Sequence, residues 1–149
     1  MHVDHTGEAI TMRHAIGAIT LAILGSTAAF GQARIGERCN GTETIRAGGN
    51  APRVVPYTLT FSADLAAGYY CYAACGPEQT YAISDRASDP IKLADVRESS
   101  QTRLMTFDRR TAMLVDHQVI RLLGSVTRSA TARCRAAPFH APVPPGSNG

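Results

Sequence analysis

The sequence predicts an all-β domain, a small antiparallel barrel or sandwich of about seven short strands. Three observations lead to this fold class. Beyond residue 33 there is no long helical pattern, short segments alternate apolar and polar side chains, and turn-forming residues separate these segments at nearly regular spacing. A doubly wound α/β fold would need helices between the strands, so we expect the strands to pair antiparallel.

The first three strands lie in residues 57–84, which hold all five tyrosines and two of the four cysteines. Tyr57, Leu59 and Phe61 alternate with threonines, which is the period-two pattern of a half-buried strand. Residues 62–68 then reverse the chain. The strands expected in the whole domain are residues 57–61, 69–73, 80–84, 91–96, 103–107, 113–122 and 125–134.

Polar turns separate the later strands. Residues 85–90 precede the fourth strand, residues 98–101 follow it, and residues 108–111 connect the fifth strand to the sixth. In the seventh strand, 125–134, Arg128 falls in the same phase as the apolar residues. Because an unpaired buried arginine would cost free energy, we expect a bulge or a strand end at this residue.

The segments on either side of these strands lack a regular pattern. Residues 34–53 are rich in Gly, Asn and Thr, so we expect an irregular lead-in that contains Cys39. Residues 137–149 contain four prolines and end in Gly-Ser-Asn-Gly, which predicts an extended or disordered tail. A disulfide-bonded β domain is therefore expected over residues 34–136.

Residues 1–33 are expected to be a signal peptide with a helical apolar segment. Residues 15–24 form an uninterrupted run of apolar and small side chains that follows a basic residue and precedes a stretch of small residues. This layout is typical of a secretory leader. The run is far shorter than the roughly 20 apolar residues that a membrane-spanning helix needs.

Cleavage of this leader is expected after Ala33, with Ala29 and Gly31 as alternatives. The acidic residues near the beginning do not fit a positively charged leader, and Met12 is an alternative start. The mature protein is therefore expected to be periplasmic or secreted, without a membrane span.

Four cysteines in a short exported chain predict two disulfides. Pairing of Cys39 with Cys134 is favoured because it would join the two ends of the domain. Cys71 would then pair with Cys75, and since bridged Cα atoms lie within about 7 Å, the chain must turn between them. The alternative is a zinc site, but only one cysteine pair has a suitable spacing, so we expect no metal ion.

Composition and motifs argue against several other function classes. The formal net charge is only +3, and the arginines are scattered instead of gathered with aromatic residues, which argues against nucleic-acid binding. The sequence contains no phosphate-binding glycine loop, calcium loop or redox C-x-x-C. Asp116 beside His117 would suit a hydrolase, but no nucleophile motif accompanies them. We therefore expect no cofactor and no enzymatic activity.

Several short motifs are spread over most of residues 39–134. They are Cys39-Asn40-Gly41, residues 57–62, Tyr70-Cys71 with Cys75, Ile91-Lys92-Leu93 and residues 107–111. Together they resemble a group of small exported proteins of alphaproteobacteria for which no activity is established. The resemblance implies a periplasmic location and assigns no functional residue.

The tyrosines provide the candidate binding surface. Tyr70 and Tyr72 fall on the opposite strand face from Cys71, so we expect them to be an exposed pair, with Arg109 and Arg110 as a charged rim. The alternative is that the tyrosines are ordinary strand residues. The expected function is an exported, non-catalytic binding or envelope-associated protein whose partner is a protein or a small ligand. The alternative function is a proteinaceous inhibitor of a secreted enzyme such as a lysozyme.

Overall fold

The computed structural model describes residues 33–147. Apart from Ala33, the predicted signal peptide lies outside the described residues. Within residues 33–147, no helix is long and apolar enough to cross a membrane.

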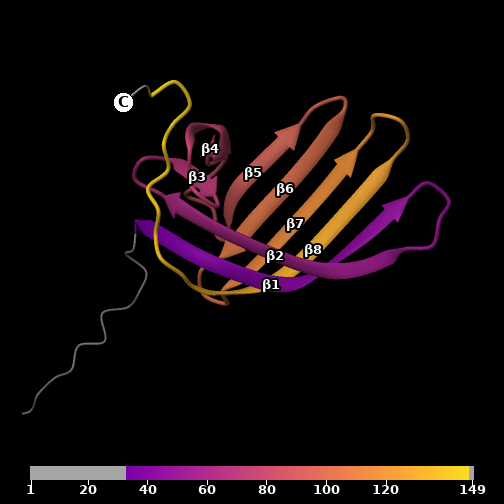
Figure 1. Cartoon of the computed structure of the whole chain (residues 1–149), viewed down its shortest axis with the longest axis horizontal. Coiled ribbons are helices and arrows are strands. Elements are labelled where there is room, and N and C mark those ends of the chain that lie inside the picture. Colours follow the sequence, from indigo (N-terminus) through magenta and orange to yellow (C-terminus); the bar gives the residue numbers. More distant parts are fainter. Residues whose placement is uncertain (1–32, 148–149) are drawn as a thin grey trace, which may run out of the picture. The chain divides into compact units, whose positions relative to one another are not determined.

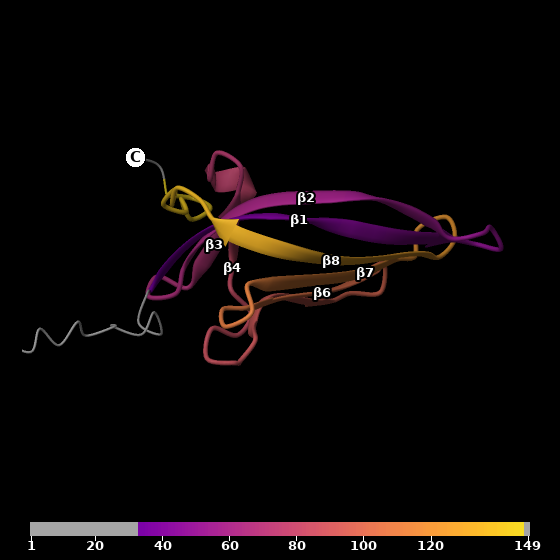
Figure 2. The ribbon, with the colours of Figure 1, turned by 90° about the horizontal axis from the view of Figure 1, so that it is seen from below.

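Eight antiparallel strands form a single sheet that curls into a nearly closed barrel, which confirms the all-β prediction (Figures 1 and 2). A 3-10 turn at Pro77–Gln79 is the one helical element among residues 33–147. The order of the strands in the sheet is β4-β3-β2-β1-β8-β7-β6-β5. The strands are β1 (Arg34–Ala47), β2 (Arg53–Asp64), β3 (Tyr69–Tyr72), β4 (Thr80–Ala82), β5 (Ile91–Arg97), β6 (Gln101–Asp108), β7 (Met113–Ile120) and β8 (Val126–Ala136).

The strands at the two edges of the sheet, β4 and β5, are connected by the loop of residues 83–90. After β4 the chain continues beside β3, where Ile83 N donates to Gly68 O. The backbones of Asp85 and Lys92 then exchange two hydrogen bonds of 3.0 Å, which ties the loop to β5. In Figure 2, β1, β2 and β8 lie on one side of the barrel and β6 and β7 on the other.

The strand β1 is the main departure from the sequence prediction, because residues 34–53 were expected to be an irregular lead-in. Instead β1 pairs with β2 on one side and with β8 on the other along almost its entire length. Its interior face has a period of two, but half of the side chains on that face are glutamate or glycine, so no apolar alternation is visible. The inward residues are Ile35, Glu37, Cys39, Gly41, Glu43 and Ile45.

Gly41 allows β1 and β8 to approach closely. A Cβ atom at this position would overlap with the carbonyl oxygen of Thr131 and with the Cα atom of Ala132. Glycine inside a strand commonly marks such a close backbone approach. The glycine that obscures the strand pattern is therefore needed for the close pairing of β1 with β8.

The barrel core lies toward the end that contains β3, β4 and the start of β1. Phe61 and Phe107 meet there edge to face, with ring centroids 5.4 Å apart. This geometry is a favoured one for aromatic pairs. The buried core residues are Ile35, Cys39, Phe61, Ala63, Tyr70, Ile91, Leu93, Ala94, Met105, Phe107, Leu114, Ala132 and Cys134.

Both predicted disulfides are present. Cys39 and Cys134 are directly opposite each other on β1 and β8, with Cα atoms 3.9 Å apart, and their bond lies in the core. Cys71 and Cys75 are joined across a turn that follows β3. Two residues of the turn have left-handed backbone conformations, Ala73 with φ of 48° and Cys75 with φ of 60°. Cys75 N donates a hydrogen bond to Tyr72 O, which closes the turn.

In the described part of the C-terminal tail, residues 137–144 are extended and pack on the outer face of the sheet, and a turn follows at residues 145–146 (Figure 1). His140 N donates to Ser62 Oγ at 3.0 Å, and Val143 N donates to Cys75 O at 3.2 Å. The carbonyl oxygen of His140 lies 3.7 Å from Cys71 Sγ. The tail therefore covers the Cys71–Cys75 disulfide, which explains why an outward-facing cysteine pair is buried.

Candidate functional site

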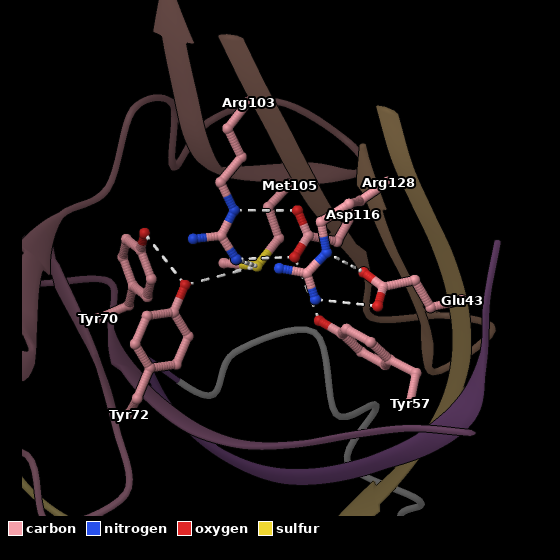
Figure 3. A network of polar contacts seen from close by, with 8 residues as sticks. All are labelled: Glu43, Tyr57, Tyr70, Tyr72, Arg103, Met105, Asp116 and Arg128. Atoms are coloured by element: carbon pink, nitrogen blue, oxygen red, sulfur yellow. Dashed lines mark hydrogen bonds and ion pairs between the residues drawn. The ribbon is translucent and has the colours of Figure 1, made fainter. Parts of the chain in front are cut away.

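A cavity of about 260 Å³ lies inside the barrel, toward the end of β1 that is remote from the apolar core (Figure 3). It is open to solvent on one side, where the side chain of Arg128 is 42% exposed. We call this space the barrel pocket. Its lining comes from six strands and consists of Glu43, Tyr57, Leu59, Tyr72, Arg103, Asp116, Gln118 and Arg128.

Two successive rungs of the sheet supply the charged side chains of the barrel pocket. The basic rung runs across β8, β7 and β6, where Arg128 pairs with Gln118 and Gln118 pairs with Arg103. The acidic rung, one step away on the same face, carries Glu43 on β1 and Asp116 on β7 with Ala130 of β8 between them. Directly paired residues of an antiparallel sheet share a face, so both rungs project into the barrel.

The two rungs are joined by two Arg–carboxylate pairs of the same geometry. Arg103 donates from Nε and Nη2 to Asp116 at 2.9 and 2.7 Å, and Arg128 donates from Nε and Nη2 to Glu43 at 2.9 and 2.9 Å. The carboxylates are the more buried members, with exposed side-chain fractions of 12% for Asp116 and 8% for Glu43. Such two-point pairing satisfies both oxygens of each carboxylate.

The prediction of a bulge or a strand end at Arg128 is wrong. Arg128 lies within the regular register of β8, opposite Ile45 and Gln118. It faces the interior without a penalty for an unpaired charge because Glu43 neutralises it. The partner is 85 residues away in the sequence.

Tyrosines surround the Arg103–Asp116 pair. The Tyr57 hydroxyl donates to Asp116 Oδ2 at 3.2 Å, and the guanidinium carbon of Arg103 lies 5.8 Å from the centre of the Tyr72 ring. Burial, with a smaller contribution from Asp116, raises the pKa of Tyr57, and burial also raises the pKa of Tyr72. Both hydroxyls therefore stay protonated at neutral pH.

The charge of Arg103 is fixed by its partners. Burial alone would lower the pKa of Arg103, but its hydrogen bonds to Asp116 and the negative charge of that carboxylate outweigh the effect of burial, and the pKa lies above its usual value. The barrel pocket thus holds two Arg–carboxylate pairs and neutral tyrosines. These groups can bind and orient a ligand.

The expectation that Tyr70 and Tyr72 form an exposed pair is wrong. They do lie on the opposite face from Cys71, but that face is the interior of the barrel, where Tyr70 is only 3% exposed. Their rings meet edge to face, with centroids 5.4 Å apart. The reason is that Cys71 is buried by the C-terminal tail and not by the core, so burial of the cysteine does not mark the inner face. Tyr72 is instead part of the lining of the barrel pocket.

Arg109 and Arg110 are exposed in the turn between β6 and β7 and do not line the barrel pocket. Arg110 forms an ion pair of 3.2 Å with Asp89 of the loop before β5. A joint surface of these arginines with Tyr70 and Tyr72 is therefore not formed. A role for the arginines alone stays a prediction.

The residues suggested by a hydrolase hypothesis do not meet. Asp116 faces the barrel pocket, whereas His117 is on the outer face of β7, where its Nδ1 lies 2.8 Å from Ser129 Oγ. Among residues 33–147, no carboxylate hydrogen-bonds to His117 to orient it. The part of the chain that the structure describes also contains no group of three or more His, Cys, Asp or Glu side chains arranged to hold a metal ion.

Sequence reasoning missed most of the barrel pocket, although one signal was available. Asp116 and Gln118 are in phase with the buried Leu114, and Arg103 is in phase with the buried Met105. When several strands each carry a charged side chain in the inward phase, these charges either pair with one another in the interior or line a cavity. Of these inward charged residues, only Arg128 was recognised from the sequence as lying in an apolar phase.

Comparisons of the chain with protein-family models, with curated proteins and with solved structures found no significant match. The function must therefore be argued from the geometry of the barrel pocket.

Proposed function

We propose that this chain is an exported, non-catalytic binding protein that takes a small molecule into the barrel pocket. One observation carries the proposal: two Arg–carboxylate pairs line an open cavity inside a disulfide-bonded barrel. Ligand sites in proteins are typically concave, with apolar walls and a few convergent polar groups. Here Leu59, Tyr57 and Tyr72 provide the walls, and the two pairs provide the polar groups.

The energetic argument supports a binding role over a purely structural one. Removing charges from water costs several kcal/mol per ion, and well-packed apolar residues would stabilise a barrel end at least as well as buried ion pairs. The other end of this barrel is packed in that way, around Phe61 and Phe107. Charged groups around an open cavity are therefore better explained by a ligand than by packing.

Export is supported by the disulfides. Both cysteine pairs are oxidised in the folded chain, and disulfides persist mainly in the periplasm or outside the cell. We expect the protein recovered from the periplasm of a bacterial host to begin at Arg34. Amino-terminal sequencing measures this, and recovery of a chain that retains residues 15–24 in the membrane fraction would reject it.

Native mass spectrometry of the periplasmic protein tests the small-molecule proposal. We expect a bound mass that is lost in Gln118→Phe, because the larger side chain would occupy the barrel pocket. The matched control is His117→Phe, which makes a similar change on the exposed outer face of the same strand and should retain the bound mass. Equal retention by both variants would show that the ligand binds elsewhere.

A second candidate, inhibition of a secreted enzyme, is favoured by the loop between β7 and β8. Leu122 and Leu123 are 73% and 106% exposed there, and such a projecting apolar loop could enter the cleft of an enzyme. Size-exclusion chromatography with a lysozyme tests this function. A one-to-one complex that is lost in the Leu122→Ser, Leu123→Ser double variant would support inhibition. Separate elution of the two wild-type proteins would reject inhibition of that enzyme.

A further inference from the structure

We infer that the ligand of the barrel pocket is a small monocarboxylate with an aromatic or apolar body. The inference rests on the proposed function, since it specifies the chemistry of the same site. It follows from which hydrogen-bond donors and acceptors around the barrel pocket have no partner among residues 33–147.

Both carboxylates of the barrel pocket are already paired with a guanidinium group. Both oxygens of Glu43 accept from Arg128, and both oxygens of Asp116 accept from Arg103, with Tyr57 adding a further hydrogen bond to Asp116 Oδ2. A cationic ligand would have to displace a guanidinium group from one of these two-point pairs. The cavity is therefore poorly suited to an ammonium or a metal ion.

The donors, in contrast, are only partly used. Each arginine engages its carboxylate through Nε and Nη2, and no residue in the range 33–147 accepts a hydrogen bond from the Nη1 of Arg103 or Arg128. Figure 3 shows the third nitrogen of each guanidinium group pointing away from its carboxylate. The side-chain amide of Gln118, between the two arginines on the basic rung, likewise has no hydrogen-bond partner within the described chain. The Gln118 amide can donate or accept, whereas the two Nη1 groups can only donate, so most of the unused capacity is on the donor side and favours a ligand that supplies acceptors.

The positions of these donors suit one small anionic group. Arg103 and Arg128 are on strands that flank β7, so their Cα atoms are separated by about 10 Å, twice the spacing of neighbouring strands. Arg103 leans toward Asp116 of β7 and Arg128 toward Glu43 of β1, and both guanidinium groups line the barrel pocket, where a carboxylate can accept from their Nη1 atoms. Guanidinium groups match the geometry of a carboxylate well because their N–H donors are arranged in a planar fork.

Charge balance favours a monoanion over a dianion. The two arginines are offset by Glu43 and Asp116, so these four groups together contribute no net charge to the barrel pocket. A single added negative charge faces two guanidinium groups at short range, whereas a second one would be close to two carboxylates without further compensation. The walls made by Leu59 and Tyr72 then accommodate an uncharged body.

Isothermal titration with benzoate and with its uncharged isostere benzamide tests the inference. We expect the wild-type protein to bind benzoate at least tenfold more tightly than benzamide. Arg128→Lys should lose about tenfold in benzoate affinity, because lysine keeps the charge opposite Glu43 but lacks the second donor arm. The matched control is Arg133→Lys on the exposed outer face of β8, and its affinity should be unchanged.

Three results would count against the inference, and they separate it from the proposed function. Equal binding of benzamide and benzoate would leave a small-molecule pocket but reject anion recognition. Tighter binding of inorganic phosphate than of benzoate, in competition, would reject a monocarboxylate. Absence of benzoate binding at about 10 mM would reject the ligand class, since even a 1 mM dissociation constant needs only about 4 kcal/mol. A bound mass of another chemistry in the native protein would then still support the binding function.

Discussion

The Cys39→Ala, Cys134→Ala double variant should lose about 4 to 5 kcal/mol of unfolding free energy, the largest effect that we expect from any change outside the barrel pocket. The bond closes a loop of 95 residues, and removing it restores conformational freedom to the unfolded chain in proportion to the logarithm of that length. Alanine is the suitable replacement because both sulfurs lie in the apolar core, where a serine hydroxyl would add its own cost. Urea-induced unfolding, followed by circular dichroism, measures the difference.

The matched control is the Cys71→Ala, Cys75→Ala variant. This disulfide closes a separation of only 4 residues, so the same chain-entropy argument gives about 2 kcal/mol. A short-loop variant that loses as much stability as the long-loop variant would contradict the argument. It would indicate that docking of the C-terminal tail on the Cys71–Cys75 disulfide contributes more than the loop closure.

Arg103→Met should destabilise the protein by about 3 to 5 kcal/mol. The change leaves the carboxylate of Asp116 without its guanidinium partner at a position where the side chain is only 12% exposed, and an uncompensated buried charge is strongly unfavourable. Chemical denaturation at neutral pH measures the loss.

A double variant separates the cost of an unpaired charge from the loss of packing. Arg103→Met with Asp116→Leu removes both charges and replaces them with side chains of related size, so most of the lost stability should return. A double variant that remains as unstable as Arg103→Met would show that the packing of Arg103 against Tyr72 and Met105, and not its charge, accounts for the effect. The double variant should also lose benzoate binding, because one of the two donors is absent.

All seven strands expected from the sequence are present, and each keeps an apolar alternation over at least part of its length. Tyr57, Leu59 and Phe61 in β2 and Leu93 in β5 all face the interior, as their phase indicated. The first strand was missed because Gly41 and Glu43 occupy inward positions for reasons of strand approach and charge pairing. Those reasons arise from β8, and no local pattern contains them.

The candidate site could be predicted only in fragments for the same physical reason. Glu43 pairs with Arg128, and Tyr57 reaches Asp116, across 85 and 59 positions of sequence. A single sequence shows each of these residues as an isolated polar side chain in an apolar phase. The sheet order, with β1 next to β8, is what brings them together.

The prediction for Tyr70 and Tyr72 was wrong because β3 is buried on both faces, so burial of Cys71 does not identify the inner face of the strand. The alternation correctly placed Tyr70 and Tyr72 on one face and Cys71 on the other. Choosing which face was interior required knowing that residues 137–147 fold back over the outer side, and a segment rich in proline gives no signal of where it docks.

The most direct test of the central claim is a nitrogen-15 NMR titration of the full mature protein with benzoate. We expect the Nε–H signals of Arg103 and Arg128 and the side-chain amide of Gln118 to shift together with a single dissociation constant, while the Nε–H signal of Arg133 on the exposed outer face of β8 stays unchanged. Saturable shifts at these three side chains would locate the ligand between the two arginines. Shifts confined to the outer face or to the loop of Leu122 and Leu123, with the arginine signals unchanged, would contradict a ligand site inside the barrel.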